Sequence, residues 1–229
     1  MEKYAVIVAG GTGSRMNSKL PKQFIEIGSL PILMHTLLQF NKADTNIKII
    51  LVLPENQIDV WNNLCEKYEF DASNVRIVIG GSSRFQSCKN GIFAIENENA
   101  IVAIHDAVRP FVSTHIIEKG YQLAAELGNA ICAVQSKDSA RIINENGANS
   151  SIERKQLRLI QTPQVFQLKN LKLAYSVPEQ DIFTDDASVV EAAGFSINLF
   201  EGDYKNIKIT TPEDHTLAEV YLKHNLQNK

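Results

Sequence analysis

Short apolar runs and amphipathic stretches alternate along most of this chain. The apolar runs have the length and the β-branched content that are typical of buried strands, and they fall at residues 5–9, 48–53, 75–79, 100–104 and 130–134. Apolar residues recur at helical spacing near residues 32–40, 58–68, 87–95, 114–127 and 212–222. Continuous apolar strands separated by helices are typical of a parallel sheet covered on both faces. The pattern therefore predicts an α/β fold, a three-layer Rossmann-like sandwich with a mostly parallel sheet.

One segment, residues 135–162, departs from this alternation. Two short strand-like runs, which include Ile142 and Ile152, flank a polar turn at residues 144–147, a pattern that predicts a pair of strands. We interpret it as a β-arm, at about residues 135–160, that leaves the main sheet of a single domain spanning residues 1–229. Because a projecting hairpin has little core of its own, a second copy of the chain is its natural support. We therefore predict a homodimer formed through the arm.

A glycine-rich loop follows the first predicted strand. Residues 10–16 read Gly-Gly-Thr-Gly-Ser-Arg-Met, and Pro21 and Lys22 follow shortly afterwards. Glycines let backbone N–H groups turn toward an anion, and Arg15, Lys19 and Lys22 bring positive charge. The loop lacks the third glycine of a dinucleotide fingerprint and the Gly-Lys-Ser/Thr of a P-loop. It is consistent with a triphosphate pocket, although a plain turn between strand and helix is the alternative.

Two further loops are expected at the same edge of the sheet, because ligands of such sheets bind beyond the carboxyl ends of the strands. Asp106 and Arg109 follow the strand at 100–104 and could bind Mg²⁺, a sugar hydroxyl or a phosphate, or could form a helix cap with a surface ion pair. Gly81, Ser82 and Ser87 follow the strand at 75–79 and form either a base-recognition loop or a serine-capped turn.

Lys208 stands in an Ile-Lys-Ile run that predicts a strand just before a helix starting at Pro212. Its side chain faces either solvent at a sheet edge or a charged pocket. The pattern of apolar residues is compatible with both.

Composition narrows the class of protein. The formal net charge is −3, which argues against an extended nucleic-acid surface. Cys65, Cys88 and Cys132 are far apart and lack metal-site spacing, which suits small buried residues in a reducing cytoplasm. No apolar run approaches 18 residues, and the first strand is too short for a signal-peptide core. We expect a soluble cytoplasmic protein that does not interact with membranes.

These motifs resemble the 2-C-methyl-D-erythritol 4-phosphate cytidylyltransferase family of the non-mevalonate isoprenoid pathway. The signature loop and the Pro-Lys-Gln that follows it stand at 9–16 and 21–23, and the His-Asp-Ala-x-Arg-Pro signature at 105–110. The later elements Thr-Pro-Gln, Thr-Asp-Asp-Ala-Ser and Asn-Ile-Lys-x-Thr stand at 162–164, 184–188 and 206–210. The resemblance implies transfer of a cytidylyl group from CTP to methylerythritol 4-phosphate, with release of pyrophosphate and a requirement for Mg²⁺.

The resemblance also implies roles for individual residues. At position 139 a threonine is common in the family, whereas this chain has Ser139, which keeps the hydroxyl. The arm residues would reach across a dimer to the sugar phosphate, and Asp106 would hold hydroxyls near a metal held mainly by CTP phosphates. No acid–base pair is needed, because the incoming phosphate is already a nucleophile, so His105 is expected to orient its loop. The implied roles are catalytic for Arg15, Lys22 and Lys208; nucleotide-binding for Ala9, Gly10, Gly11, Gly13, Gly81, Ser82, Ser87 and Ala107; and substrate-binding for Asp106, Arg109, Ser139, Arg154 and Thr184.

Three alternatives stay open at this point. The nearest is a ribitol 5-phosphate cytidylyltransferase, but the run at 184–188 favours methylerythritol phosphate as the acceptor. The second is a non-catalytic nucleotide-binding module, which would be expected to lose a cation, whereas Arg15, Lys22 and Lys208 are all present. The third is an NAD-linked oxidoreductase, which Met16 disfavours because it stands where a glycine is needed.

Overall fold

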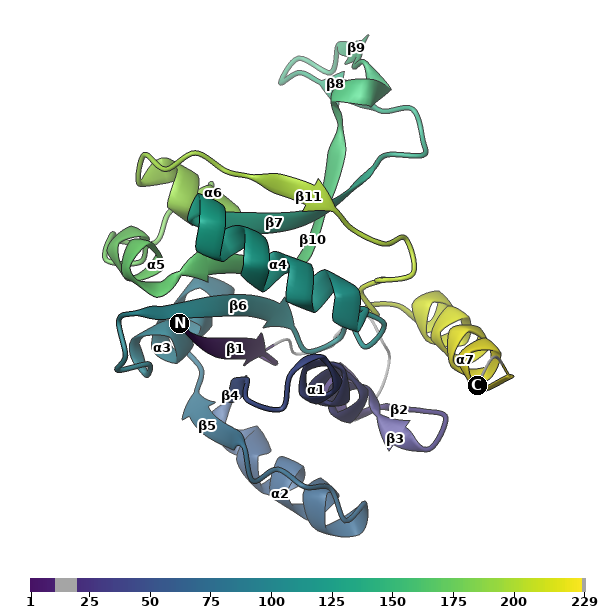
Figure 1. Ribbon diagram of the computed structural model, residues 1–229. Coiled ribbons are helices and arrows are strands. Elements are labelled where there is room, and N and C mark those ends of the chain that lie inside the picture. The colour runs from purple at the N-terminus through teal and green to yellow at the C-terminus, as the bar shows by residue number, and fades with distance from the viewer. Residues whose placement is uncertain (11–19, 228–229) are drawn as a thin grey trace.

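A central sheet organises residues 1–10 and 20–227, the part of the chain that the computed structural model describes (Figure 1). Its seven strands are β1 (Glu2–Val8), β4 (Lys48–Leu53), β5 (Val75–Ile79), β6 (Ala100–Asp106), β7 (Asn129–Gln135), β10 (Arg158–Gln167) and β11 (Leu199–Glu201). They lie in the order β11-β7-β10-β6-β1-β4-β5. Neighbouring strands are parallel except where β10 pairs with β6 and β7. The sheet is therefore mostly parallel, as predicted.

Helices cover both faces of this sheet. One face carries α1 (Ile32–Ala43), α2 (Ile58–Lys67) and α4 (Thr114–Leu127), and the other carries α3 (Arg84–Phe93), α5 (Leu168–Ala174) and α6 (Asp186–Ala192). Successive side chains of a strand point to opposite faces. Accordingly, Ala5 and Ile7 of β1 join the apolar cluster of the first face, whereas Val6 joins that of the second. Burial on both faces explains the continuous apolar runs in the sequence and confirms the three-layer α/β fold.

The last helix, α7 (Pro212–Gln227), packs against a small third cluster that includes Ile27 of the β2 (Glu26–Ile27) and β3 (Leu30–Pro31) hairpin. The helix begins at Pro212, as predicted. The Thr211 N–H donates to Asp214 Oδ2 at 2.9 Å, and the Asp214 N–H donates back to Thr211 Oγ1 at 3.3 Å, which satisfies two N–H groups at the start of the helix. Within the described part of the chain, neither α7 nor any other helix is long and apolar enough to cross a membrane.

The β-arm leaves the end of the main sheet. Strands β8 (Arg141–Ile143) and β9 (Asn149–Ser151) pair only with each other among the described residues, and η4 (Arg154–Gln156) leads back into β10. Figure 1 shows the arm projecting away from the sheet and from α7. Ile142 is 51% exposed and Ile143 is 74% exposed. The arm therefore offers apolar side chains that its own subunit leaves uncovered.

Two expectations about local structure were wrong. Lys208 lies in an irregular segment rather than a strand. Helix α3 begins at Arg84, before the predicted residue 87, because Ser83 caps it by accepting a hydrogen bond from the Gln86 N–H at 3.0 Å. The earlier start places Arg84 in the first turn of α3, at the sheet edge where the predicted site lies.

Candidate active site

A cavity of about 340 Å³ opens at the carboxyl ends of β1, β5 and β6. It lies where the order of the parallel strands reverses around β1, a position at which α/β sheets commonly bind ligands. The residues that line it are Val8, Ala9, Gly10, Lys22, Gln23, Gly81, Ser82, Ser83, Arg84, Ser87, Asp106, Ala107, Val108 and Lys208. The structure thus brings together the described residues for which nucleotide-binding roles are expected, along with Lys22, Lys208 and Asp106.

The loop after β5 is held by Ser87. The Gly81 N–H donates to Ser87 Oγ at 3.1 Å, which folds the loop back over the start of α3. A Cβ atom on Gly81 would lie 2.3 Å from Cβ of Gln86, so a side chain has no room there. A Cβ on Gly10 would lie 3.4 Å from Ser87 Oγ, which shows how closely the ends of β1 and β5 approach each other. The glycines keep backbone groups accessible in a narrow space.

Gln23 also lines this cavity. The sequence predicted no role for it, although it belongs to the Pro-Lys-Gln motif. Its side chain is buried, and its Nε2 donates to the Ala9 carbonyl at 2.7 Å and to Gln57 Oε1 at 2.6 Å. Gln57 ends the short helix η3 (Glu55–Gln57), so two loops are joined beneath the end of β1. These bonds fix η2 (Lys22–Phe24), and with it the Lys22 backbone, beside the cavity.

Asp106, which lines the same cavity, is the centre of a cluster of charges. Its Oδ2 lies 3.1 Å from Lys208 Nζ and 3.2 Å from Arg109 Nε. Arg84 Nε lies 4.0 Å from the other oxygen, Oδ1. Burial alone would raise the pKa of the Asp106 carboxyl, but the three cations outweigh this effect and hold the pKa well below its usual range. Asp106 is therefore a carboxylate throughout the physiological pH range.

Hydrogen bonds to β10 hold this cluster in place. The Asp106 N–H donates to Thr162 Oγ1 at 3.0 Å, and Asn206 Nδ2 donates to the Thr162 carbonyl at 2.8 Å. Arg109 Nη1 donates to the Asn206 carbonyl at 2.8 Å. These bonds position the irregular segment that carries Lys208 so that its amine reaches Asp106. Arg109 itself does not line the cavity and acts as a brace behind it.

His105 lies fully buried beneath this loop. Burial lowers the pKa of its imidazole from 6.5 to about 4. Its Nε2 lies 3.2 Å from the Arg109 carbonyl, so the neutral ring donates to that carbonyl when Nε2 carries the proton. This geometry suits the loop-orienting role expected of it, and His105 itself does not line the cavity.

Arg84 is the charged cavity residue that the sequence reading passed over. Its Nη1 and Nη2 donate to the two carboxylate oxygens of Asp186 at 3.2 and 2.6 Å. The signal available in the sequence was its place at the end of the run Gly81-Ser82-Ser83-Arg84. Its partner is 102 residues away, which local patterns do not reveal.

The other expected site residues are not gathered around the cavity. Ser139 and Arg154 lie exposed on the arm, where Arg154 Nη1 donates to the Lys137 carbonyl at 3.0 Å. Thr184 is exposed just before α6 and does not line the cavity. Gly11, Gly13 and Arg15 fall outside the described residues.

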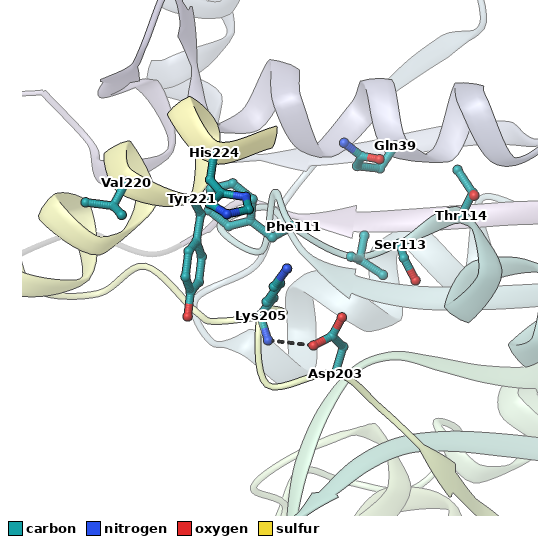
Figure 2. A pocket seen from close by; sticks show the side chains of 10 residues that line it. Gln39, Phe111, Ser113, Thr114, Asp203, Lys205, Val220, Tyr221 and His224 are labelled. Atoms are coloured by element: carbon teal, nitrogen blue, oxygen red, sulfur yellow. Dashed lines mark hydrogen bonds between the residues drawn. The ribbon is translucent and has the colours of Figure 1, made fainter. Parts of the chain in front are cut away.

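A separate cavity of about 490 Å³ lies beside α7 (Figure 2). Figure 2 shows Phe111, Tyr221 and His224 on one side of it, and the Lys205 N–H donating to Asp203 Oδ1 at 2.8 Å on another. Of the expected site residues that the structure describes, none lines this cavity. It is larger than the one at the strand ends, but the cluster of charged and glycine residues distinguishes the smaller cavity as the candidate site.

Comparison with known proteins gives consistent matches over almost the whole chain. The family profile for 2-C-methyl-D-erythritol 4-phosphate cytidylyltransferase matches residues 4–224. A relative of that name from Bacteroides thetaiotaomicron is 44% identical over 222 residues, covering 97% of this chain and 100% of the relative. One from Clostridium acetobutylicum is 41% identical over 225 residues, covering 96% of this chain and 97% of the relative.

Solved structures agree. The 4-diphosphocytidyl-2C-methyl-D-erythritol synthase of Anaerococcus prevotii superposes with a TM-score of 0.82 at 32% identity, over 96% of this chain and 95% of the other. The 2-C-methyl-D-erythritol 4-phosphate cytidylyltransferase of Thermus thermophilus superposes with a TM-score of 0.77 at 26% identity, over 97% and 100%. Sheet, helical layers and arm all fall within the matched residues.

Proposed function

The chain belongs to the 2-C-methyl-D-erythritol 4-phosphate cytidylyltransferase family, and we propose that the cavity at the ends of β1, β5 and β6 is where it carries out the family's reaction. The enzyme transfers a cytidylyl group from CTP to methylerythritol 4-phosphate and releases pyrophosphate, a step in isoprenoid precursor synthesis. The observation that carries the location is the meeting of the glycine loops with the cations around Asp106 in one cavity.

The nucleotide occupies the side of the cavity formed by the two glycine loops. The chain around Ala9 and Gly10 and the loop of Gly81, Ser82 and Ser87 expose backbone groups that can read the edge of a cytosine. The Gly81–Ser87 hydrogen bond holds the loop after β5, and the Gln23–Ala9 hydrogen bond holds the chain at the end of β1, before CTP enters. Preorganised polar groups of this kind provide specificity without reorganisation on binding.

Catalysis then depends on positioning and charge. A phosphate oxygen of the acceptor attacks the α-phosphorus of CTP in line, and negative charge spreads over the equatorial oxygens and the departing pyrophosphate. Lys22 and Lys208, which both line the cavity, stabilise that charge together with Arg15. The buried His105, with a pKa of about 4, takes no part in proton transfer. Ala107 and Arg109 keep the Asp106 loop in place.

Asp106 would hold Mg²⁺ together with the phosphates of CTP. Among the described residues no group of three or more His, Cys, Asp and Glu side chains could hold a metal by itself. Asp106 is the acidic residue that lines the cavity. The cation nearest to its Oδ1 is 4.0 Å away, farther than the cations around Oδ2. This donor set fits Mg²⁺, which commonly uses one or two carboxylates together with substrate phosphates and water. The ion, when bound, offsets negative charge on the phosphates that react.

The arm completes the site in a homodimer. Ser139 and Arg154 lie on the arm and do not line the cavity of their own subunit. Ile142 and Ile143 of the arm are exposed apolar side chains that a partner subunit would bury. We expect Ser139 and Arg154 of the partner subunit to contact the acceptor phosphate. Unpaired Cys65, Cys88 and Cys132 support a cytoplasmic location.

Mixing two inactive variants tests the arm. In a mixed dimer of Lys208→Ala and Arg154→Ala subunits, one site combines an intact cavity with an intact arm. Activity of about a quarter of the wild-type level is expected, since roughly half of randomly formed dimers are mixed and each has one complete site. Two Lys208→Ala preparations mixed together are the control and should stay inactive. No recovery after verified subunit exchange would show that the arm does not act across the dimer.

The acceptor is tested by pyrophosphate release from CTP and Mg²⁺, with methylerythritol 4-phosphate and ribitol 5-phosphate run in parallel. Release with the first alone is expected. Release with ribitol 5-phosphate alone would move the protein to that sister activity, and silence with both would favour a non-catalytic nucleotide-binding module.

A further inference from the structure

Arg84, Asp186 and Tyr175 form a charged network behind the active-site cavity. Asp186 is fully buried in the first turn of α6, and it accepts hydrogen bonds from Arg84 Nη1 and Nη2 and, at 2.6 Å, from the Tyr175 hydroxyl. The Tyr175 ring is also buried and stacks on Phe85, the residue after Arg84, with ring centroids 4.8 Å apart. The network thus joins α3, α5 and α6 on one face of the sheet.

Stability alone does not account for these groups. A buried ion pair is often no more stabilising than apolar side chains of the same volume, because removing two charges from water is costly. The surrounding residues of this face form an apolar cluster that could accommodate such a replacement. A bidentate arginine–carboxylate pair does, however, fix the plane and direction of the guanidinium group.

The fixed guanidinium turns its third nitrogen toward Asp106, the residue to which the proposed function assigns the acceptor. With Nη1 and Nη2 on Asp186, Nε lies 4.0 Å from Asp106 Oδ1. Arg84 also lines the cavity next to Ser82 and Ser83. Its positive charge is matched by the buried carboxylate of Asp186, so the pair adds little net charge to hold the triphosphate. Its effect must come from where it places Asp106.

We propose that Arg84 is a positioning residue for Asp106, held in its orientation by Asp186 and Tyr175. It braces the Oδ1 side of the carboxylate, while Arg109 and Lys208 brace the Oδ2 side. Two residues of the run at 184–188 then act without touching substrate: Asp185 caps α6, and Asp186 orients Arg84. The proposal rests on the proposed function, in which Asp106 holds the acceptor.

Arg84→Lys tests the proposal because it keeps the charge and loses the fork. The KM for methylerythritol 4-phosphate should rise about tenfold, as expected for the loss of a charge-assisted bidentate contact, while the KM for CTP changes by less than about twofold. Tyr175→Phe removes one hydroxyl and should shift the acceptor KM in the same direction by a smaller factor. Arg76→Lys is the matched control. Arg76 lies on β5, donates to the Ala94 carbonyl and does not line the cavity, so both KM values should be unchanged.

A double-mutant cycle separates positioning from a structural effect. If Arg84 acts through Asp106, Arg84→Lys should change activity by less than about twofold when made in the Asp106→Asn background. Equal effects in both backgrounds, a parallel rise in both KM values, or an Arg84→Lys enzyme with wild-type acceptor KM would each overturn the proposal. Wild-type protein that is inactive with methylerythritol 4-phosphate would instead count against the proposed function.

Discussion

Replacing Lys208 by alanine is the sharpest test of how charge is used in this site. The amine lies 3.1 Å from Asp106 Oδ2, and its side chain is 40% exposed, so it faces the cavity as well as the carboxylate. Asp106 keeps Arg109 at 3.2 Å and Arg84 at 4.0 Å when Lys208 is removed. The carboxylate is therefore still paired in the variant.

The effect on folding and the effect on catalysis should differ greatly in size. A partly exposed ion pair contributes about 0–1 kcal/mol to stability, and the two remaining cations prevent a buried charge from being left alone. A cation that meets the developing charge on the phosphates is expected to stabilise the transition state by about 3–4 kcal/mol, or about 10²-fold to 10³-fold in kcat. We therefore expect a folded, nearly inactive enzyme.

The assay is steady-state pyrophosphate release, combined with thermal unfolding of the same preparations. Lys205→Ala is the matched control, because Lys205 belongs to the same irregular segment but lines the cavity beside α7 (Figure 2). It should keep wild-type kcat. A Lys208→Ala variant within tenfold of wild-type kcat, or one that is unfolded, would refute the assignment of this lysine to the reaction.

Two further predictions concern stability. The pKa of His105 is about 4 in the folded state, against an ordinary value of 6.5, so the unfolded chain takes up a proton first as the pH falls. This residue should therefore lower the free energy of unfolding by roughly 3 kcal/mol between pH 6.5 and 4. Urea unfolding of His105→Asn should lack this contribution to the pH dependence of the free energy. Equal slopes would contradict the buried neutral ring. Gly91→Ala should destabilise the fold by about 1–3 kcal/mol, because its Cβ would lie 2.6 Å from Val6 Cγ1 and 2.8 Å from Val52 Cγ2; an unchanged melting temperature would show that α3 can move away from the sheet.

The parallel part of the sheet could be predicted because each strand carries its own signal. The runs at Lys48–Leu53 and Val75–Ile79 are rich in Ile, Val and Leu and end at Pro54 and Gly80, and they match β4 and β5 at both ends. Such strands are apolar because helices cover both of their faces. The local sequence therefore contains the information that sets their position.

Strand β10 was not predicted, because its middle is polar. Gln161, Thr162 and Gln164 surround a proline and suggest a turn, yet all three are buried. Each has a distant partner: Gln161 Nε2 donates to the Asp203 carbonyl, Thr162 Oγ1 accepts from the Asp106 N–H, and Gln164 Nε2 donates to Asp185 Oδ2. Buried polar groups satisfied by remote segments look locally like loop residues.

The charges of the site also depend on partners that are distant in the sequence, and these partners distinguish the roles of the three cations. Arg84, Arg109 and Lys208 reach Asp106 from three segments, and each alone could be a surface cation. In the folded chain Arg84 is bound to Asp186, and the side chain of Arg109, only 11% exposed, is bound to the Asn206 carbonyl. Both are committed to holding the loop. Lys208 has the most exposed side chain of the three and reaches Asp106 through a flexible aliphatic chain. It is therefore the cation of this cluster that can turn toward a phosphate while Asp106 stays in place.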